Sequence, residues 1–338
     1  MQNYTSTIEQ IVGQVRQTQS VQVLQPPAVG RTTRRNELLM FAKPEIFMVE
    51  NPDHSSAALD MIFRKLNEFN AEVSGVILVS GKALEDAEIM NRHYGFINEM
   101  SRRASEAVSA DDRAKIERLL GVSLDEYRVY GGHEFLKSDG SYTPQSRNEL
   151  WQSRGKTSKV RGGFYVQAFD TDGEKFVLVN AFHPVQLSHF TEPSRRIALM
   201  LVHSDTDWST LRNDLIGATD PEKAAAGSIR RTLYESPARY GFDSVGIGNN
   251  GVHLSAGPYE GAFEILNFLG RLVNFDVQAQ PPLIIRKLQD AGLSLEQALA
   301  ATTNPTIQKD GKTTDLFGAT EDVNTEDAVA LYVQAVKA

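Results

Sequence analysis

The order of the apolar segments constrains the fold of this chain more than any other feature. A short apolar run from Glu37 to Ala42 ends at Lys43-Pro44, as expected of a buried strand stopped by proline. A helical pattern follows, with Asn51 as its capping residue and apolar side chains three to four positions apart. The Val- and Ile-rich run Val73 to Val79 then predicts a second strand, and a second helix begins at Gly81.

The same alternation returns later in the chain. Arg196 to Val202 predicts a buried strand and Asp207 to Leu215 a helix, and we expect a further strand to begin at Arg230 to Leu233. A helix is predicted from Pro258 through Leu269. This order indicates an α+β fold of ferredoxin-like topology, an antiparallel sheet covered by helices on one face.

Composition narrows the classes of function. The 338 residues carry a formal net charge of -8, which does not favour nucleic-acid binding through phosphate neutralisation. The absence of cysteine excludes disulfides and thiolate chemistry. We find no run that predicts a signal peptide or a membrane span, so a cytoplasmic protein without membrane or nucleic-acid partners is expected.

Four short motifs stand in a fixed order between residues 217 and 264. They are Gly217-Ala218-Thr219-Asp220-Pro221, Gly227-Ser228-Ile229-Arg230, Asn250-Gly251-Val252-His253-Leu254-Ser255, and Glu264 on the helix that follows. A single histidine is usually a packed or surface residue. A histidine among an Asn, a Ser, an Arg and a helical Glu is more informative, because these side chains bind phosphate or orient an imidazole.

These motifs resemble those of nucleoside diphosphate kinases. In that family, Asn-x-x-His-x-Ser surrounds a phosphate-accepting histidine, and Gly-x-Thr-x-Pro and Gly-[Thr/Ser]-Ile-Arg precede it. The strand ending in Lys43-Pro44 and the dipeptide His93-Tyr94 match the family as well. The resemblance implies transfer of the γ-phosphate from a nucleoside triphosphate to a nucleoside diphosphate through a phosphohistidine, with ping-pong kinetics.

The resemblance also implies roles for individual residues. His253, Glu264, Ser255 and Tyr94 would form the catalytic group. The nucleotide would be bound by Lys43, Thr219, Arg230, Asn250, Ile247, Arg212, His183 and Phe182. Mg²⁺ would arrive with the nucleotide phosphates, because it gives up its water ligands reluctantly. A homo-oligomer is implied.

The chain departs from the family in its organisation. We expect an N-terminal arm or linker at 1–36 with one short amphipathic helix near Ile8 to Val15, or a tail that packs on a neighbouring subunit. A kinase-like domain is expected at 37–269. An insertion of about 103–180 interrupts that domain and includes a predicted hairpin at 164–179, and a helical extension follows at 270–338.

Two sequence features leave the function open. The family has an arginine where this chain has Asn213, with Arg212 one residue earlier, and an Asn cannot replace the charge of an arginine. The alternative function is therefore a weak or inactive nucleotide-binding relative. The basic run Arg154, Lys156, Lys159 and Arg161 in the insertion predicts either a solvated loop or a phosphate-binding lid.

Overall fold

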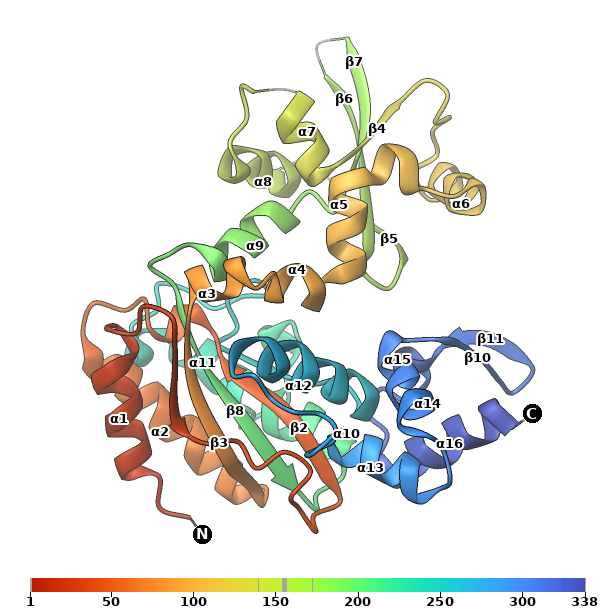
Figure 1. Cartoon of the computed structure of the whole chain (residues 1–338). Coiled ribbons are helices and arrows are strands. Elements are labelled where there is room, and N and C mark those ends of the chain that lie inside the picture. The colour runs from red at the N-terminus through yellow and green to blue at the C-terminus, as the bar shows by residue number, and fades with distance from the viewer. Residues whose placement is uncertain (1, 139, 154–156, 172, 338) are drawn as a thin grey trace. The chain divides into compact units, whose positions relative to one another are not determined.

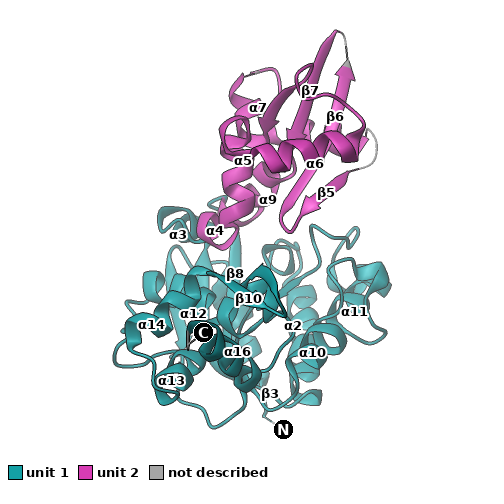
Figure 2. Ribbon diagram, turned by 90° about the vertical axis from the view of Figure 1, so that its right-hand side faces the viewer, with its two compact units in different colours: residues 1–89, 192–338 teal, residues 90–191 magenta. Residues whose placement is uncertain are grey.

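The computed structural model describes residues 2–138, 140–153, 157–171 and 173–337. The chain divides into two compact units, residues 1–89 with 192–338 and residues 90–191 (Figure 2). The sequence places an insertion at about 103–180, and the compact second unit begins earlier and ends later than that. In the described part of the chain, no helix is both long and apolar enough to cross a membrane.

The first unit is built on a five-stranded sheet in the order β1-β3-β8-β2-β9, in which all neighbours are antiparallel (Figure 1). Its strands are β1 (Val21–Gln25), β2 (Asn36–Ala42), β3 (Ala71–Ser80), β8 (Arg196–Ser204) and β9 (Val252–Leu254). The four strands after β1, with α2 (Pro52–Glu68) and α11 (Ile229–Glu235) between them, follow a β-α-β-β-α-β order. The antiparallel α+β architecture expected from the sequence is therefore present.

Helices cover both faces of this sheet, which corrects the prediction of helices on one face. Leu38 and Met40 of β2 point into the core formed with α1 (Thr5–Val15), α2 and α11. Because successive strand side chains point to opposite faces, Phe41 lies on the other side. There its ring contacts Phe268 of α12 (Pro258–Leu272), at a centroid distance of 5.7 Å.

Two local predictions differ from the structure. The segment predicted as an arm contains α1, which includes the helix expected near Ile8 to Val15, but it also contains β1, which pairs with β3 as a fifth strand. The strand predicted at Arg230 to Leu233 is wrong, because these residues lie in helix α11. The Ser228 side chain caps this helix by accepting a hydrogen bond from the Arg231 amide, and Ile229 and Leu233, one turn apart, are both buried.

Short elements connect the sheet to the rest of the first unit. They are η1 (Pro44–Ile46), α3 (Gly81–Asp86), α10 (Trp208–Thr210), the π-helical turn η2 (Leu211–Ile216), η3 (Pro221–Lys223) and η4 (Pro237–Tyr240). The C-terminal part comprises α13 (Leu283–Asp290), α14 (Leu295–Ala300), η5 (Ala301–Thr303), β10 (Thr306–Lys309), β11 (Lys312–Asp315), α15 (Leu316–Ala319) and α16 (Thr325–Lys337). Ser294 caps α14 through a capping box with Gln297.

The second unit contains a four-stranded sheet in the order β4-β7-β6-β5, with β4 parallel to β7 and the other pairs antiparallel. Its strands are β4 (Arg128–Gly131), β5 (Ser158–Arg161), β6 (Phe164–Thr171) and β7 (Glu174–Val179). Its helices are α5 (Gly95–Ala107), α6 (Ala110–Leu120), α7 (Gly132–Ser138), α8 (Pro144–Ser153) and α9 (His183–Thr191). The short helix α4 (Ile89–His93) spans the boundary between the units in the sequence.

The two faces of this second sheet carry separate cores. Met100 of α5 and Ile116 of α6 pack with Val166 and Val177 on one face. Helices α7 and α8 cover the opposite face, with Phe135 and Trp151 in its core. The second unit is therefore a sheet between two layers of helices (Figure 1).

Candidate functional site

His253 lies in the middle of the edge strand β9, opposite Phe41 of β2. The two rings are stacked with their centroids 4.5 Å apart and an angle of 16° between their planes. This stacking and the backbone pairing restrict the rotation of the imidazole. The His253 side chain is 17% exposed, so it is shielded but still accessible.

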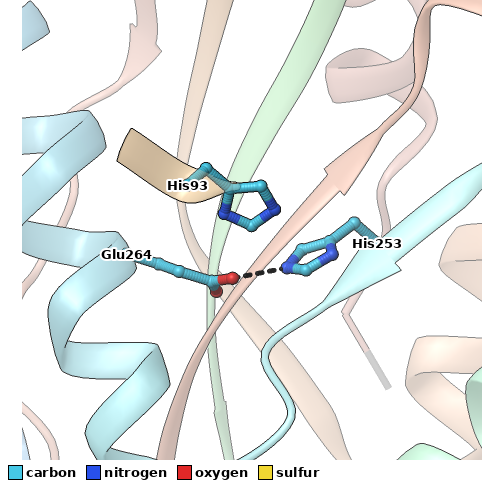
Figure 3. Close-up of side chains that lie close together, drawn as sticks. All are labelled: His93, His253 and Glu264. Atoms are coloured by element: carbon cyan, nitrogen blue, oxygen red, sulfur yellow. Dashed lines mark hydrogen bonds and ion pairs between the residues drawn. The ribbon is translucent and has the colours of Figure 1, made fainter. Parts of the chain in front are cut away.

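Glu264 holds one nitrogen of this imidazole. Its Oε1 lies 2.7 Å from His253 Nε2 (Figure 3), and its own side chain is fully buried on α12. The Ser255 hydroxyl donates to Glu264 Oε2 at 2.5 Å and accepts the Leu39 amide at 3.0 Å. Ser255 therefore anchors the carboxylate to strand β2, and the carboxylate fixes the ring of His253.

A second group of side chains gathers around Asn250. Its Oδ1 accepts a hydrogen bond from Lys43 Nζ at 2.6 Å, and its Nδ2 donates to the backbone carbonyl of Thr219 at 2.9 Å. One amide thus joins the end of β2 to the loop around Thr219. The side chains of Thr219 and Ile247 are exposed, Ile247 by 63%.

Arg230 is buried between the loop around Thr219 and strand β9. Its guanidinium donates to the carbonyl of Gly217 at 2.9 Å and to that of Val252 at 3.0 Å, one residue before the histidine. Arg212 donates to the carbonyl of Leu254 at 3.2 Å on the other side of the histidine. The two arginines therefore hydrogen-bond the backbone carbonyls of the residues immediately before and after His253.

The structure assigns Arg212 and Asn213 to different environments. Arg212 lies 3.5 Å from Glu321 and 3.4 Å from Asp322, so carboxylates of the C-terminal segment offset its charge. Asn213 is exposed and donates to the Ser209 carbonyl one turn back at 2.8 Å. Asn213 therefore contributes no positive charge to the site.

The electrostatics of the site keep the histidine neutral. Burial lowers the pKa of His253 well below its usual value, and the positive charges of Lys43, Arg212 and Arg230 lower it further. Burial also lowers the pKa of Lys43 to about 8, with Glu45 opposing and Arg230 adding to the shift. At neutral pH the site therefore combines a neutral imidazole with a lysine that can still carry its proton.

Three predicted site residues belong to the second unit. The ring of Tyr94 lies edge-on to that of His183 at a centroid distance of 5.9 Å, and Phe182 packs against Trp151 and Tyr165. His183 is buried, with its nitrogens 3.1 Å from Gln186 Oε1 and 3.3 Å from Asn98 Oδ1. Their predicted roles at a nucleotide stay predictions.

Of the basic run predicted in the insertion, only Lys159 and Arg161 lie in the described part of the chain. Arg161 lies 3.2 Å from Asp112 and its guanidinium lies over the Phe96 ring at 4.2 Å, so both contacts are structural. Lys159 lies on strand β5. Arg154 and Lys156 are outside the described residues.

Comparison with known proteins gives a distant likeness of structure only. No protein-family model matches the chain, and no curated protein matches it. Among solved structures, a nucleoside diphosphate kinase from Aquifex aeolicus is 14% identical, with a TM-score of 0.30, over 69% of this chain and 93% of that one. The transition-state mimic of the Borrelia burgdorferi enzyme, with bound vanadate and ADP, is 14% identical, with a TM-score of 0.34, over 71% of this chain and 92% of that one.

The NDP kinase from Pyrobaculum aerophilum is 15% identical, with a TM-score of 0.33, over 69% of this chain and 94% of that one. A likeness at this level supports no conclusion about what this chain does. Its activity has to be inferred from the geometry of its own residues.

Sequence reasoning missed three residues of the site. Phe41 stacks on His253, Glu45 accepts the Gly251 amide at 2.8 Å, and Glu260 lies one helical turn before Glu264. Burial and the neighbouring Glu264 raise the pKa of Glu260 to about 8. The spacing of four residues on a predicted helix was the available signal for Glu260, since such residues share a helical face.

Proposed function

We propose that the first unit transfers the γ-phosphate of a nucleoside triphosphate to a nucleoside diphosphate, with His253 as the phosphate carrier. The observation that supports this most directly is the relay from Ser255 through Glu264 to His253. Because Nε2 lies 2.7 Å from a carboxylate oxygen, it carries the ring proton, and the lone pair of the neutral imidazole is on Nδ1. A neutral nitrogen with a fixed tautomer is a suitable nucleophile near neutral pH.

The proposed reaction has two steps that balance without a net proton transfer. In the first, the Nδ1 lone pair attacks the γ-phosphorus and the bond to the β,γ-bridging oxygen breaks, which releases the nucleoside diphosphate. The ring becomes cationic, and the buried Glu264 carboxylate stabilises that charge through Nε2–H. In the second, a terminal phosphate oxygen of another diphosphate attacks the same phosphorus, the P–N bond breaks, and neutral His253 is restored.

Groups around the histidine supply what a nucleotide requires. Lys43 and Arg230 provide positive charge for the phosphates, Asn250 and Thr219 provide hydrogen-bonding groups, and the exposed Ile247 side chain provides an apolar surface for a base. We expect the substrate to bring its own Mg²⁺, because the Glu264 and Glu45 carboxylates beside the histidine already accept hydrogen bonds from the protein and Lys43 and Arg230 are cations. The Mg²⁺ would neutralise part of the phosphate charge.

A weak or inactive nucleotide-binding relative is the second candidate. The exposed position of Asn213 and the carboxylates beside Arg212 favour it, since both reduce the positive charge offered to a phosphate. In this case the His253–Glu264 pair would persist and nucleotide would bind, while turnover would be slow.

The deciding experiment is incubation of the purified protein with γ-labelled ATP, followed by detection of acid-labile phosphate and a chase with GDP. We expect wild type to take up label and GDP to discharge it as GTP, and His253→Ala to take up none. His54→Ala is the matched control, because His54 is a histidine of the same unit whose Nδ1 lies 3.1 Å from the Arg239 carbonyl. It should label like wild type.

The other outcomes separate the two candidates. Labelling of His253→Ala at the wild-type level would contradict His253 as the carrier. Failure of wild type to label, with ATP binding still detected by calorimetry, would favour the nucleotide-binding relative.

We also propose that the protein works as a homo-oligomer, as the resemblance of its motifs implies, and that it is cytoplasmic, as expected from a sequence without a signal-peptide or membrane-span pattern. Sedimentation velocity of the full chain checks the oligomeric part of this proposal. A single species at the mass of one chain would contradict it.

A further inference from the structure

Arg147 of α8 is a buried cation that has no hydrogen-bond partner among the described residues. Its side chain is fully buried, and no residue in the described part of the chain hydrogen-bonds Nε, Nη1 or Nη2 of its guanidinium. Burial lowers the pKa of Arg147 to about 10, which leaves it charged at neutral pH. A buried charge with no partner is costly, so an arginine that retains its charge calls for an anion.

Gln167 of β6 is a second buried side chain whose polar atoms are unsatisfied within the described part of the chain. It is 2% exposed, and neither its Nε2 nor its Oε1 has a hydrogen-bond partner among the described residues. This amide therefore leaves one donor and one acceptor group unsatisfied inside the second unit, where each lost hydrogen bond is unfavourable.

Both side chains lie on the same face of the second sheet. Strand side chains alternate, so Gln167 points to the side of Tyr165 and Phe169. Phe169 and Tyr165 belong to the core under α7 and α8, which also contains Trp151. Arg147 precedes Trp151 by one turn of α8, and both are buried, so Arg147 faces this layer too.

We propose that Arg147 and Gln167 form a buried binding site for a phosphate group in the second unit. A phosphate accepts two parallel hydrogen bonds from a guanidinium. Hydrogen phosphate can also accept from the Gln167 amide and donate its own O–H to the amide oxygen, so one phosphate that reaches both side chains would satisfy them. A carboxylate offers no such donor at neutral pH.

The surroundings of Arg147 fit an anion better than a structural ion pair. His133 is close enough for the Arg147 charge to contribute to its pKa, which burial lowers to about 3. The charges of Arg102 and Lys137 act on the same imidazole. His133 is therefore neutral, and the nearby charged groups that act on it are positive, as in an anion site.

Thermal unfolding of the full chain in millimolar inorganic phosphate, against chloride at constant ionic strength, tests this proposal. We expect phosphate at about ten times its Kd to raise the Tm of wild type by roughly 2–4 °C. Arg147→Met, which keeps the length and packing of the side chain, should abolish the rise. Arg103→Met is the matched control, because it removes an exposed arginine of the second unit that pairs with Glu106, and it should preserve the rise.

General salting-out by phosphate would raise the Tm of wild type and Arg147→Met equally, and that result would overturn the proposal. No rise in wild type would also overturn it. Hydrogen exchange of wild type provides an independent measurement if Arg147→Met does not fold. Phosphate should slow amide exchange in α8 and β6 relative to chloride, and unchanged exchange there would count against the site.

Discussion

Glu260 and Glu264 are two carboxyl groups one helical turn apart that face the candidate site on α12. Glu264 is bound by His253 and Ser255, whereas the pKa of Glu260 is raised to about 8 by burial and by the charge of Glu264. Repulsion between two neighbouring negative charges opposes the ionisation of both carboxyl groups, so Glu260 keeps its proton at neutral pH. The inner carboxylate is thereby kept as the acceptor for His253.

We expect Glu260→Gln to stabilise the protein above neutral pH. The folded-state pKa of Glu260 is above its unfolded value, so its stabilising effect is complete at low pH and is lost as the pH rises from about 4.5 to 8. Removing this titration should add about 1 kcal/mol or more to the unfolding free energy at pH 8.5, and little at pH 4. Urea unfolding at both pH values measures the difference, with the exposed Glu296→Gln as the control. An equal change at both pH values would contradict the assignment.

Nucleotide binding should weaken as the pH rises through the pKa of Lys43. This pKa is about 8, so the ammonium that we assign to the phosphates is present below pH 8 and lost above it. We expect the Kd for ATP, measured by calorimetry, to increase between pH 7 and pH 9 in wild type. Lys43→Arg keeps its charge in this range and should show a flatter profile. A Kd independent of pH in wild type would place Lys43 away from the phosphates.

The turn into β9 decides where the histidine points. Gly251 precedes the strand with a φ of +80°, a conformation that other residues adopt only with strain. A Cβ built there would lie 2.3 Å from Leu233 Cδ1 of α11. The Gly251 carbonyl also accepts the Lys43 amide at 2.9 Å, so this turn aligns β9 with the end of β2.

We expect Gly251→Ala to destabilise the protein by about 2 kcal/mol or more, through both the strained φ and the contact with Leu233. The control is Gly248→Ala in the same loop, since a Cβ there meets nothing within 4 Å. The unfolding free energy of Gly248→Ala should stay within about 0.5 kcal/mol of the wild-type value. Equal unfolding midpoints in urea for the two variants would contradict the role of the turn.

At the scale of the whole molecule, the N-terminal segment is part of the first unit. Ile11 and Val15 of α1 are buried in its core, and the Val73 amide donates to the hydroxyl of Tyr4 at 3.0 Å. Strand β1 covers the edge of β3. Without it, a long apolar strand would have an open edge, which promotes association with other chains.

Removal of residues 1–25 should therefore lower the unfolding midpoint and increase aggregation. Ile11→Ala is expected to cost about 2–4 kcal/mol alone, whereas Glu9→Ala on the exposed side of α1 should cost little. Urea unfolding and size-exclusion chromatography measure both effects. A truncated chain that unfolds at the same urea concentration as wild type and elutes without aggregates would contradict this role.

The sequence by itself determined the main strands and helices of the first sheet, because their apolar periods and caps are local signals. The strand at Glu37 to Ala42 and the helix from Pro258 are examples. The resemblance of the motifs implied His253, Ser255 and Glu264 as partners, and in the structure the Glu264 carboxylate lies within hydrogen-bonding distance of the other two side chains. The prediction of a strand at Arg230 was wrong because the segment is too short to show a clear period. The Ser228 cap and the buried side chains of α11 make it a helix.

Only the tertiary structure decided the features that depend on distant segments. The pairing of β1 with β3 and the stacking of Phe41 on His253 each join residues far apart in the chain. The burial of Arg147 and Gln167 without hydrogen-bond partners among the described residues also depends on the packing of distant segments. The pKa of Glu260 likewise follows from burial, which no local pattern encodes. Local periodicity specifies which residues form an element, whereas burial and charge at a site depend on which elements the fold brings together.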